Sequence, residues 1–203
     1  MIVFLAKEKN QRIKQMKKAV YFCVLAMVFL SCSTTLGELH IYDISAQVSQ
    51  AGEKKANPKA QKTYGVIFSA NQPYDSTNIF RLDEVTLRSK PLPNTQWATK
   101  PREMLSTTLS SLMNAKGLNV VKQPFGGAKV QKILKMHIAR LLIIRRGNGS
   151  FAHITLDYEV VDSKTLNVEK SLSITKEAPI TEDFAPVFLR LSSDMLQEVV
   201  ERL

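Results

Sequence analysis

Apolar and polar residues alternate most clearly in the second half of the chain. Three long stretches alternate there, Val130–Arg146, Ser150–Asp162 and Leu166–Ala178, and each predicts a strand with one buried and one wet side. Gly147–Gly149 separates the first two, and glycine and asparagine tolerate the positive φ of a tight hairpin. Asp162–Thr165 supplies a second polar turn before the third strand. The pattern predicts an antiparallel meander.

Two other segments repeat apolar residues every three or four positions, which is the spacing of an amphipathic helix. The first begins at Thr99, the expected N-cap, has Pro101 in its first turn and stops at Gly117. The second begins at Thr181, again the expected cap, and continues to Leu203. Each helix has one apolar face that must be covered.

Shorter segments complete the predicted sheet: Glu38–Ser45, Thr63–Ala70, Asn78–Lys90 (one bulged strand or two short ones, broken by the following "PLPN") and Leu118–Val121. The polar stretch Ala46–Lys62, rich in lysine and glutamine, is typical of a flexible linker. Two helices with one apolar face each must pack on the apolar face of the sheet. We expect a single α+β domain over 63–203, a two-layer sandwich of a mostly antiparallel sheet with two amphipathic helices on one face.

Residues 1–31 have the three parts of a secretory signal. A basic stretch ends at Lys17-Lys18, the 12-residue apolar run Ala19–Leu30 follows, and Ser31 is small. Twelve helical residues at about 1.5 Å each span about 18 Å, less than the roughly 30 Å of a bilayer core, so a signal is favoured over a transmembrane helix. Met16 offers a second start, in which case the 15 residues before it are an upstream extension. The sequence leaves both starts open.

Cys32 follows this run directly. It could be a core thiol, half of a disulfide, or the point at which a lipid is attached. A small residue and a cysteine after an apolar run form the pattern that bacterial lipoprotein processing recognises, whereas an ordinary signal cut nearby would leave a free thiol. The other cysteine, Cys23, lies inside the run and leaves with it, so no disulfide partner remains. We favour acylation of Cys32, with chains such as palmitate holding the protein on a membrane.

The charge is unevenly distributed along the chain. The formal net charge is +10, and residues 1–31 hold six basic and one acidic side chain, a net of +5. The remaining 172 residues hold 22 basic and 17 acidic side chains, again +5. Without its signal the protein is only mildly basic, which argues against nucleic acid as a partner.

The sequence contains no GxSxG elbow, no P-loop and no dinucleotide-binding fingerprint. His40, His137 and His153 lack metal-ligand spacing, and we expect them to be surface or hydrogen-bonded histidines. Asp157 and Glu159 share one face of a strand, as a solvated edge would, so a catalytic pair there is disfavoured.

Three further features have ordinary structural explanations. Phe125–Lys129 is interpreted as a loop rather than a phosphate cradle, and Trp97 as a packing anchor rather than a ligand platform. Arg145-Arg146 is interpreted as a solvated hairpin tip, with contact to anionic headgroups or an acidic partner as the alternative. We therefore expect a protein that is not an enzyme, with no catalytic residue, no metal and no cofactor.

The pattern resembles the ABC-type transport auxiliary lipoproteins, the PqiC-like family that partners MCE-domain lipid transport systems. The likeness rests on Cys32, on "YDIS" (Tyr42–Ser45), on the Trp-Pro-leucine-rich segment Gln96–Gly117, on the long hairpin Ile133–Val168 and on the closing Phe-rich helix. It covers nearly the whole chain after Cys32. The loop Ser69–Arg81 departs from the family's pattern.

The resemblance implies a periplasm-facing lipoprotein, non-enzymatic, that serves an ABC or MCE transport system and helps to move lipid between membranes. Ser33, which follows the lipidated residue, favours the bacterial outer membrane, since an aspartate there retains lipoproteins in the inner membrane of enterobacteria. A bound lipid and a homo-oligomer are compatible with this function. The alternatives are a structural or assembly lipoprotein of the outer envelope and a periplasmic hydrolase, which would need a nucleophile–base pair in a cleft.

Overall fold

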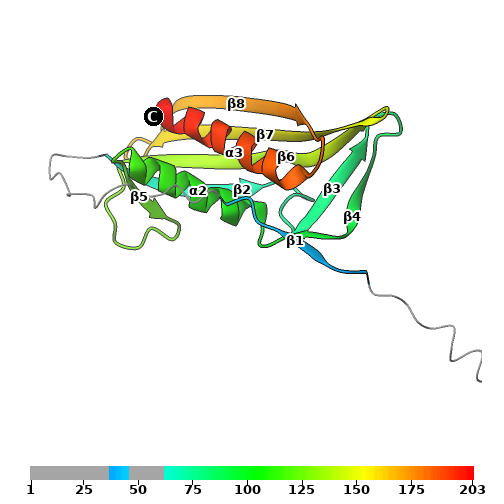
Figure 1. Cartoon of the computed structure of the whole chain (residues 1–203). Helices are drawn as coiled ribbons and strands as arrows, with labels where there is room; N and C mark the ends of the chain where they lie inside the picture. Colours follow the sequence, from blue (N-terminus) through cyan, green and yellow to red (C-terminus); the bar gives the residue numbers. More distant parts are fainter. Residues whose placement is uncertain (1–36, 46–61) are drawn as a thin grey trace, which may run out of the picture. The chain divides into compact units, whose positions relative to one another are not determined.

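The computed structural model describes residues 37–45 and 62–203. Residues Leu39–Leu203 form one unit, built from a sheet and two helices (Figure 1). The described elements, in chain order, are β1 (His40–Tyr42), β2 (Thr63–Ala70), β3 (Asn78–Asp83), β4 (Arg88–Trp97), α2 (Pro101–Ala115), β5 (Asn119–Lys122), β6 (Lys132–Arg146), β7 (Gly149–Asp162), β8 (Val168–Pro179) and α3 (Phe184–Glu201).

Strand β6 lies at the centre of the sheet. One of its edges pairs with β7 along its whole length. The other edge is shared, because Lys132–Ile138 pairs with β2 and Ile143–Arg145 pairs with β3. Strand β5 then adds to β2, while β4 and β1 add to β3. Beyond β6 the sheet therefore divides into two branches, which Figure 1 shows at opposite ends of the strand.

The predicted α+β class and two-layer arrangement are confirmed. Within the described residues the eight-stranded sheet is mixed rather than uniformly antiparallel. Its two longest pairings, β6–β7 and β7–β8, are the predicted antiparallel meander, while both branches join β6 through short parallel pairings. Parallel neighbours need a crossover connection, and α2 supplies it between β2 and β6.

A bulge makes β6 bury both of its faces in its second half. The register shifts between Ile138 and Arg140, and the four residues Leu141–Ile144 that follow are all buried. Because neighbours along a strand point to opposite faces, Leu142 and Ile144 are buried on the side of the sheet away from the helices. The helix-free face is therefore partly apolar.

Helices α2 and α3 cover the other face of the sheet (Figure 1). Their buried core residues are Met104, Leu105, Leu109 and Met113 from α2 and Phe188, Leu191, Met195, Leu196, Val199 and Val200 from α3. Alternate residues of β7 lie beneath them: Ala152, Ile154, Leu156, Tyr158 and Val160. The alternation predicted for β7 is confirmed, and this layer is the hydrophobic core.

The two helix caps were predicted one or two residues too early. Lys100, not Thr99, is the N-cap of α2, and its side chain makes no capping bond. Pro101 at the first helical position has no N–H, which leaves one donor fewer to satisfy. In α3 the cap is Asp183, not Thr181, and its carboxylate accepts a hydrogen bond from the N–H of Ala185 at 3.2 Å.

The break expected at "PLPN" is wrong, because β4 continues through Pro91 and Pro93. Only Thr95–Trp97 of β4 pairs with β1, so the proline segment has one free edge among the described strands. Proline is tolerated there because a free edge needs no ladder N–H. The segment predicted as one bulged or two short strands is thus two strands, and β1 extends the sheet to residues before Thr63.

Candidate functional site

Cys32, the predicted lipidation site, lies outside the described residues, as do the predicted signal 1–31 and nearly all of the linker Ala46–Lys62. Within the described part of the chain, neither helix is long and apolar enough to cross a bilayer. The described unit offers seven features of interest: an aromatic cluster, two polar arrangements on the helix-free face, two hairpin turns and two grooves.

An aromatic cluster joins the start of α3 to the β1–β4 edge of the sheet. The Trp97 ring is edge-on to those of Phe184 and Phe188, with centroids 6.1 and 5.6 Å away, and Tyr42 lies 4.6 Å from Phe184. Trp97 is 3% exposed. Offset aromatic pairs at these distances stabilise packing beyond the area that they bury. The prediction that Trp97 is a packing anchor is confirmed.

The histidines are surface or hydrogen-bonded residues, as predicted. His40 is exposed on β1, His137 contacts the hydroxyl of Ser69, and His153 contacts Glu177. Over residues 37–45 and 62–203, no three metal-ligating side chains are grouped closely enough to hold an ion.

One row of residues on the helix-free face has the composition of a hydrolase triad. Ser69 Oγ lies 2.9 Å from His137 Nδ1, and the register places Asp157 opposite His137 on the next strand. Three observations weaken the likeness. The Ser69 hydroxyl also donates to the carbonyl of Met136 at 3.3 Å, and no hydrogen bond or ion pair joins the described Asp157 and His137. Ser69 is exposed on a strand of an open sheet rather than set in a cleft.

A four-residue polar network joins Arg146 to three elements on the same face. Arg146 donates to Glu84 in the β3–β4 turn at 2.9 Å and makes a bidentate contact with the carboxylate of Glu177 in β8. Glu177 also contacts His153 Nδ1 at 3.1 Å. Burial raises the pKa of the Glu177 carboxyl, but the bonds from Arg146 and His153 outweigh it and leave that pKa lowered. Arg146 was expected to be solvated, and only the β7–β8 register, which pairs His153 with Glu177, reveals the network.

Two hairpin turns share the sequence Asp-x-x-Thr-Leu: "DEVTL" (Asp83–Leu87) between β3 and β4, and "DSKTL" (Asp162–Leu166) between β7 and β8. In each, the aspartate accepts hydrogen bonds from the backbone N–H and the hydroxyl of the threonine. In each, the leucine has a positive φ, 55° at Leu87 and 58° at Leu166. The turns lie at opposite ends of β6, because Asp83 pairs with Arg145 and Asp162 with Lys132.

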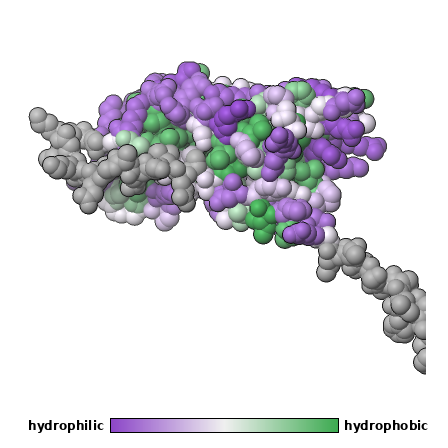
Figure 2. Space-filling model, viewed as in Figure 1, coloured by the Kyte–Doolittle hydropathy of each residue, from purple (hydrophilic) through white to green (hydrophobic). Residues whose placement is uncertain are grey.

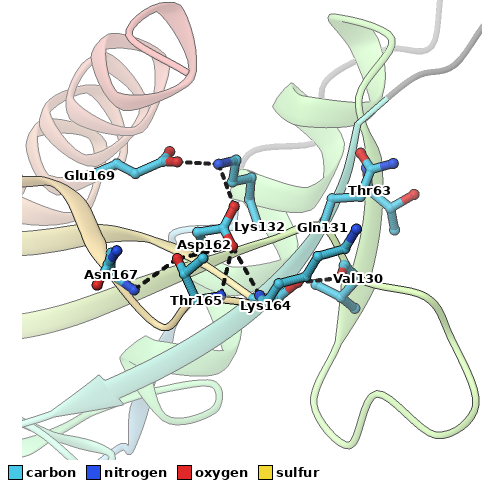
Figure 3. Close-up of polar contacts among 10 residues, drawn as sticks. Thr63, Val130, Gln131, Lys132, Asp162, Lys164, Thr165, Asn167 and Glu169 are labelled. Carbon is cyan, nitrogen blue, oxygen red and sulfur yellow. Dashed lines mark hydrogen bonds and ion pairs between the residues drawn. The ribbon is translucent and has the colours of Figure 1, made fainter.

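The second turn is held by an ionic cluster, shown in Figure 3. Lys132 Nζ lies 2.9 Å from Asp162 Oδ2 and also contacts Glu169 of β8. The N–H groups of Thr165 and Lys164 and the ammonium of Lys132 hold the pKa of Asp162 well below its usual value. The cluster closes the end of the β6–β7–β8 meander, which is a structural role.

Two grooves lie beside α2. One, of about 280 Å³, is lined by Val66, Phe68, Arg102, Glu103, Ser106, Thr107, Lys122 and Gln123. The other, of about 310 Å³, lies between the C-terminal ends of the helices, lined by Leu112, Lys116, Gln197, Val200 and Glu201. Ligand pockets span roughly 300–1,000 Å³, so each groove is at the small end of that range. On the face that Figure 2 shows, apolar residues form separate patches between hydrophilic ones rather than one continuous surface.

The fold is shared with solved bacterial structures. Protein XCC0632 from Xanthomonas campestris, of the DUF330 (PqiC-like) family, superposes with a TM-score of 0.65 at 17% identity, covering 79% of this chain and 91% of that one. A structure described only as an uncharacterized protein superposes with a TM-score of 0.59 at 10% identity, covering 81% and 95%. At these identities the likeness establishes the fold alone. No family model and no curated protein matches the chain.

Proposed function

We propose that the protein is a lipid-anchored, non-enzymatic accessory subunit of an ABC or MCE-type transport system, facing the periplasm from the outer membrane and helping to move lipid between membranes. The observation that carries the proposal is the position of Cys32, directly after a basic stretch, a 12-residue apolar run and Ser31. The fold shared with a DUF330 (PqiC-like) protein supports it, because that is the family that the sequence resembles.

Acylation of Cys32 would be enough by itself to hold the protein on a membrane. Each buried CH₂ of an acyl chain contributes about 0.8 kcal/mol, so two or three chains on Cys32 hold a protein on a bilayer permanently. The grooves beside α2 would then be contact sites for a partner side chain or a lipid headgroup, since neither is large enough to enclose a whole lipid. The partners would be the MCE or ABC subunits, and ATP hydrolysis would belong to one of those.

Acylation is tested by intact mass and membrane fractionation of the expressed protein. We expect the wild type to begin at Cys32, to carry acyl mass and to sediment with membranes, and Cys32→Ala to lose the acyl mass. Cys23→Ala is the matched control, because that cysteine is removed with the signal and its loss should change nothing. A wild-type protein without acyl mass would refute the anchor.

Partner identity separates transport from a purely structural role. Detergent extracts of the acylated protein should co-purify an MCE or ABC subunit, whereas an assembly lipoprotein of the envelope would bring down neither. Chemical crosslinking in the same extracts would report a homo-oligomer.

Because Ser69, His137 and Asp157 have the composition of a hydrolase triad, hydrolase activity is the alternative function to test. We expect no reaction of Ser69 with a fluorophosphonate probe. Its hydroxyl donates to a backbone carbonyl, and among the described residues no carboxylate bonds the His137 imidazole. Ser76→Ala is the matched control, because the Ser76 hydroxyl also donates to a backbone carbonyl. If the wild type were labelled, and Ser69→Ala abolished the labelling while Ser76→Ala did not, the non-enzymatic assignment would be overturned.

A further inference from the structure

The turn between β3 and β4 presents two apolar side chains to solvent. Val85 is 87% exposed and Leu87 is 75% exposed, the highest values among the large apolar residues described. The turn lies beside the β6–β7 turn, since the N–H of Glu84 donates to the carbonyl of Arg145 at 3.1 Å. Figure 1 shows both turns extending beyond the N-terminal end of α3. We call Glu84–Leu87 the apolar tip.

The backbone conformation at position 87 does not favour a leucine. Leu87 adopts φ 55°, a left-handed conformation that glycine or asparagine takes with little strain and leucine does not. The turn itself is fixed by Asp83, whose carboxylate accepts from the N–H and the hydroxyl of Thr86 at 2.8 and 3.0 Å. Leu166 in the turn at the opposite end of the sheet has the same left-handed conformation and is 70% exposed, so the leucine alone does not distinguish the apolar tip. The charges around the tip do.

Basic side chains surround the base of the tip. Arg88 and Arg145 both lie opposite Asp83 on neighbouring strands, and Arg81 lies directly opposite Lys90. All four are exposed, and none makes an ion pair with another described residue. The like charges of Arg81 and Lys90, directly opposite each other, destabilise the strand pair. Asp83 supplies one negative charge against these four positive ones, and a further anion would relieve the remaining repulsion. The acidic residue of the tip, Glu84, is already paired with Arg146.

We propose that the apolar tip enters the surface of a phospholipid bilayer that contains anionic lipid, with Arg81, Arg88, Lys90 and Arg145 on the phosphates. Interfacial segments bury apolar side chains by about 5–10 Å while basic residues stay at headgroup depth. At about 3.3 Å per residue, Lys90 lies roughly 10 Å behind Leu87 along the strand, which matches that depth. The contact is separate from Cys32 and does not require Cys32 to be acylated.

The full chain, as purified from membranes, is reconstituted into vesicles whose phosphatidylcholine carries brominated acyl chains, with or without phosphatidylglycerol. Val85→Trp places a fluorophore on the tip, and Val168→Trp places one at the other end of the sheet, where the native valine is also exposed. Buried Trp97 gives the same background in both. We expect phosphatidylglycerol vesicles to quench and blue-shift the emission of V85W and to leave that of V168W unchanged.

Two further pairs of variants test the assigned contacts. Leu87→Asn should abolish quenching in the V85W protein. Leu166→Asn makes the same change in the matching turn at the opposite end of the sheet and should leave the quenching of V85W unchanged. Joint Arg88→Gln and Arg145→Gln should remove the dependence on phosphatidylglycerol, as should high salt.

Equal quenching of V85W and V168W, or none in either, would overturn the proposal and leave a protein surface as the occupant of the tip. Acylation is read separately by intact mass, so an unacylated protein whose tip is quenched refutes the anchor alone, and an acylated protein whose tip is not quenched refutes this contact alone.

Discussion

At the scale of single residues, the ionisation of Asp162 is coupled to the fold. The N–H of Thr165, the ammonium of Lys132 and the N–H of Lys164 lower its pKa in the folded protein relative to the ordinary value of 3.8. A lowered carboxyl pKa contributes stability that is present above the unfolded value and is lost as pH falls through the folded one. We therefore expect Asp162→Asn to be less stable than wild type at neutral pH and to lose less stability than wild type as pH falls below about 3.8.

Urea midpoints measured from pH 7 downward would check this expectation, with Trp97 emission as the signal. Asp194→Asn is a suitable control, because it makes the same change in charge at an exposed helix position outside the described ion pairs. Parallel pH curves for wild type and D162N would show that the cluster of Lys132 and Glu169 does not depend on the Asp162 charge.

The two turns that contain Leu87 and Leu166 show which features of a turn can be predicted from its residue types and which cannot. Asp162–Thr165 was predicted as a turn because all four residues are polar, whereas Asp83–Thr86 was not, because Val85 sits in the middle of it. The repeated Asp-x-x-Thr was the available signal, since the aspartate and threonine form the turn's hydrogen bonds in both places. The positive φ of Leu87 and Leu166 could not be predicted, because leucine rarely adopts it.

At the scale of elements, periodicity succeeded wherever one face of an element is buried and the other wet. Strand β7 and both helices satisfy that condition, and the bounds of the meander and of the helices differ from the prediction by at most three residues. Periodicity failed in β4, whose proline segment has a free edge, and in the second half of β6, where Leu141–Ile144 is buried on both faces. It also said nothing about parallel pairing, which depends on where α2 returns the chain.

The candidate sites were harder to predict than the elements, because each depends on register. Ser69 and His137 are 68 positions apart, and Arg146 and Glu177 are 31 apart. A one-residue slip in β6 would have separated either pair, and the bulge after Ile138 is such a slip. Cys32 could be proposed from the sequence alone because its signal is local: basic residues, an apolar run and a small residue next to it in the chain. It stays a prediction, since it lies outside the described residues.

At the scale of the whole described unit, the two branches of the sheet have β6 in common. The branch β2–β5 and the branch β3–β4–β1 do not pair with each other, so each is held in the sheet through its own half of β6. The loop between them is tied to α2, because Asp75 Oδ1 lies 3.1 Å from Arg102 Nε. Strand β6 is therefore the strand through which both branches and the meander are joined.

This arrangement predicts an order of amide hydrogen exchange, measured by mass spectrometry of peptic peptides. Strand β6 has partners on both edges along most of its length and should exchange only on global unfolding. Strands β1 and β5, three and four residues long, should exchange first. Strand β8 is the internal comparison, because it is long but, among the described strands, pairs only with β7. Its protection should therefore fall between these extremes. If the two halves of β6 instead exchanged at different rates, the branches would open independently, and the unit would not be the single cooperative structure that a shared central strand requires.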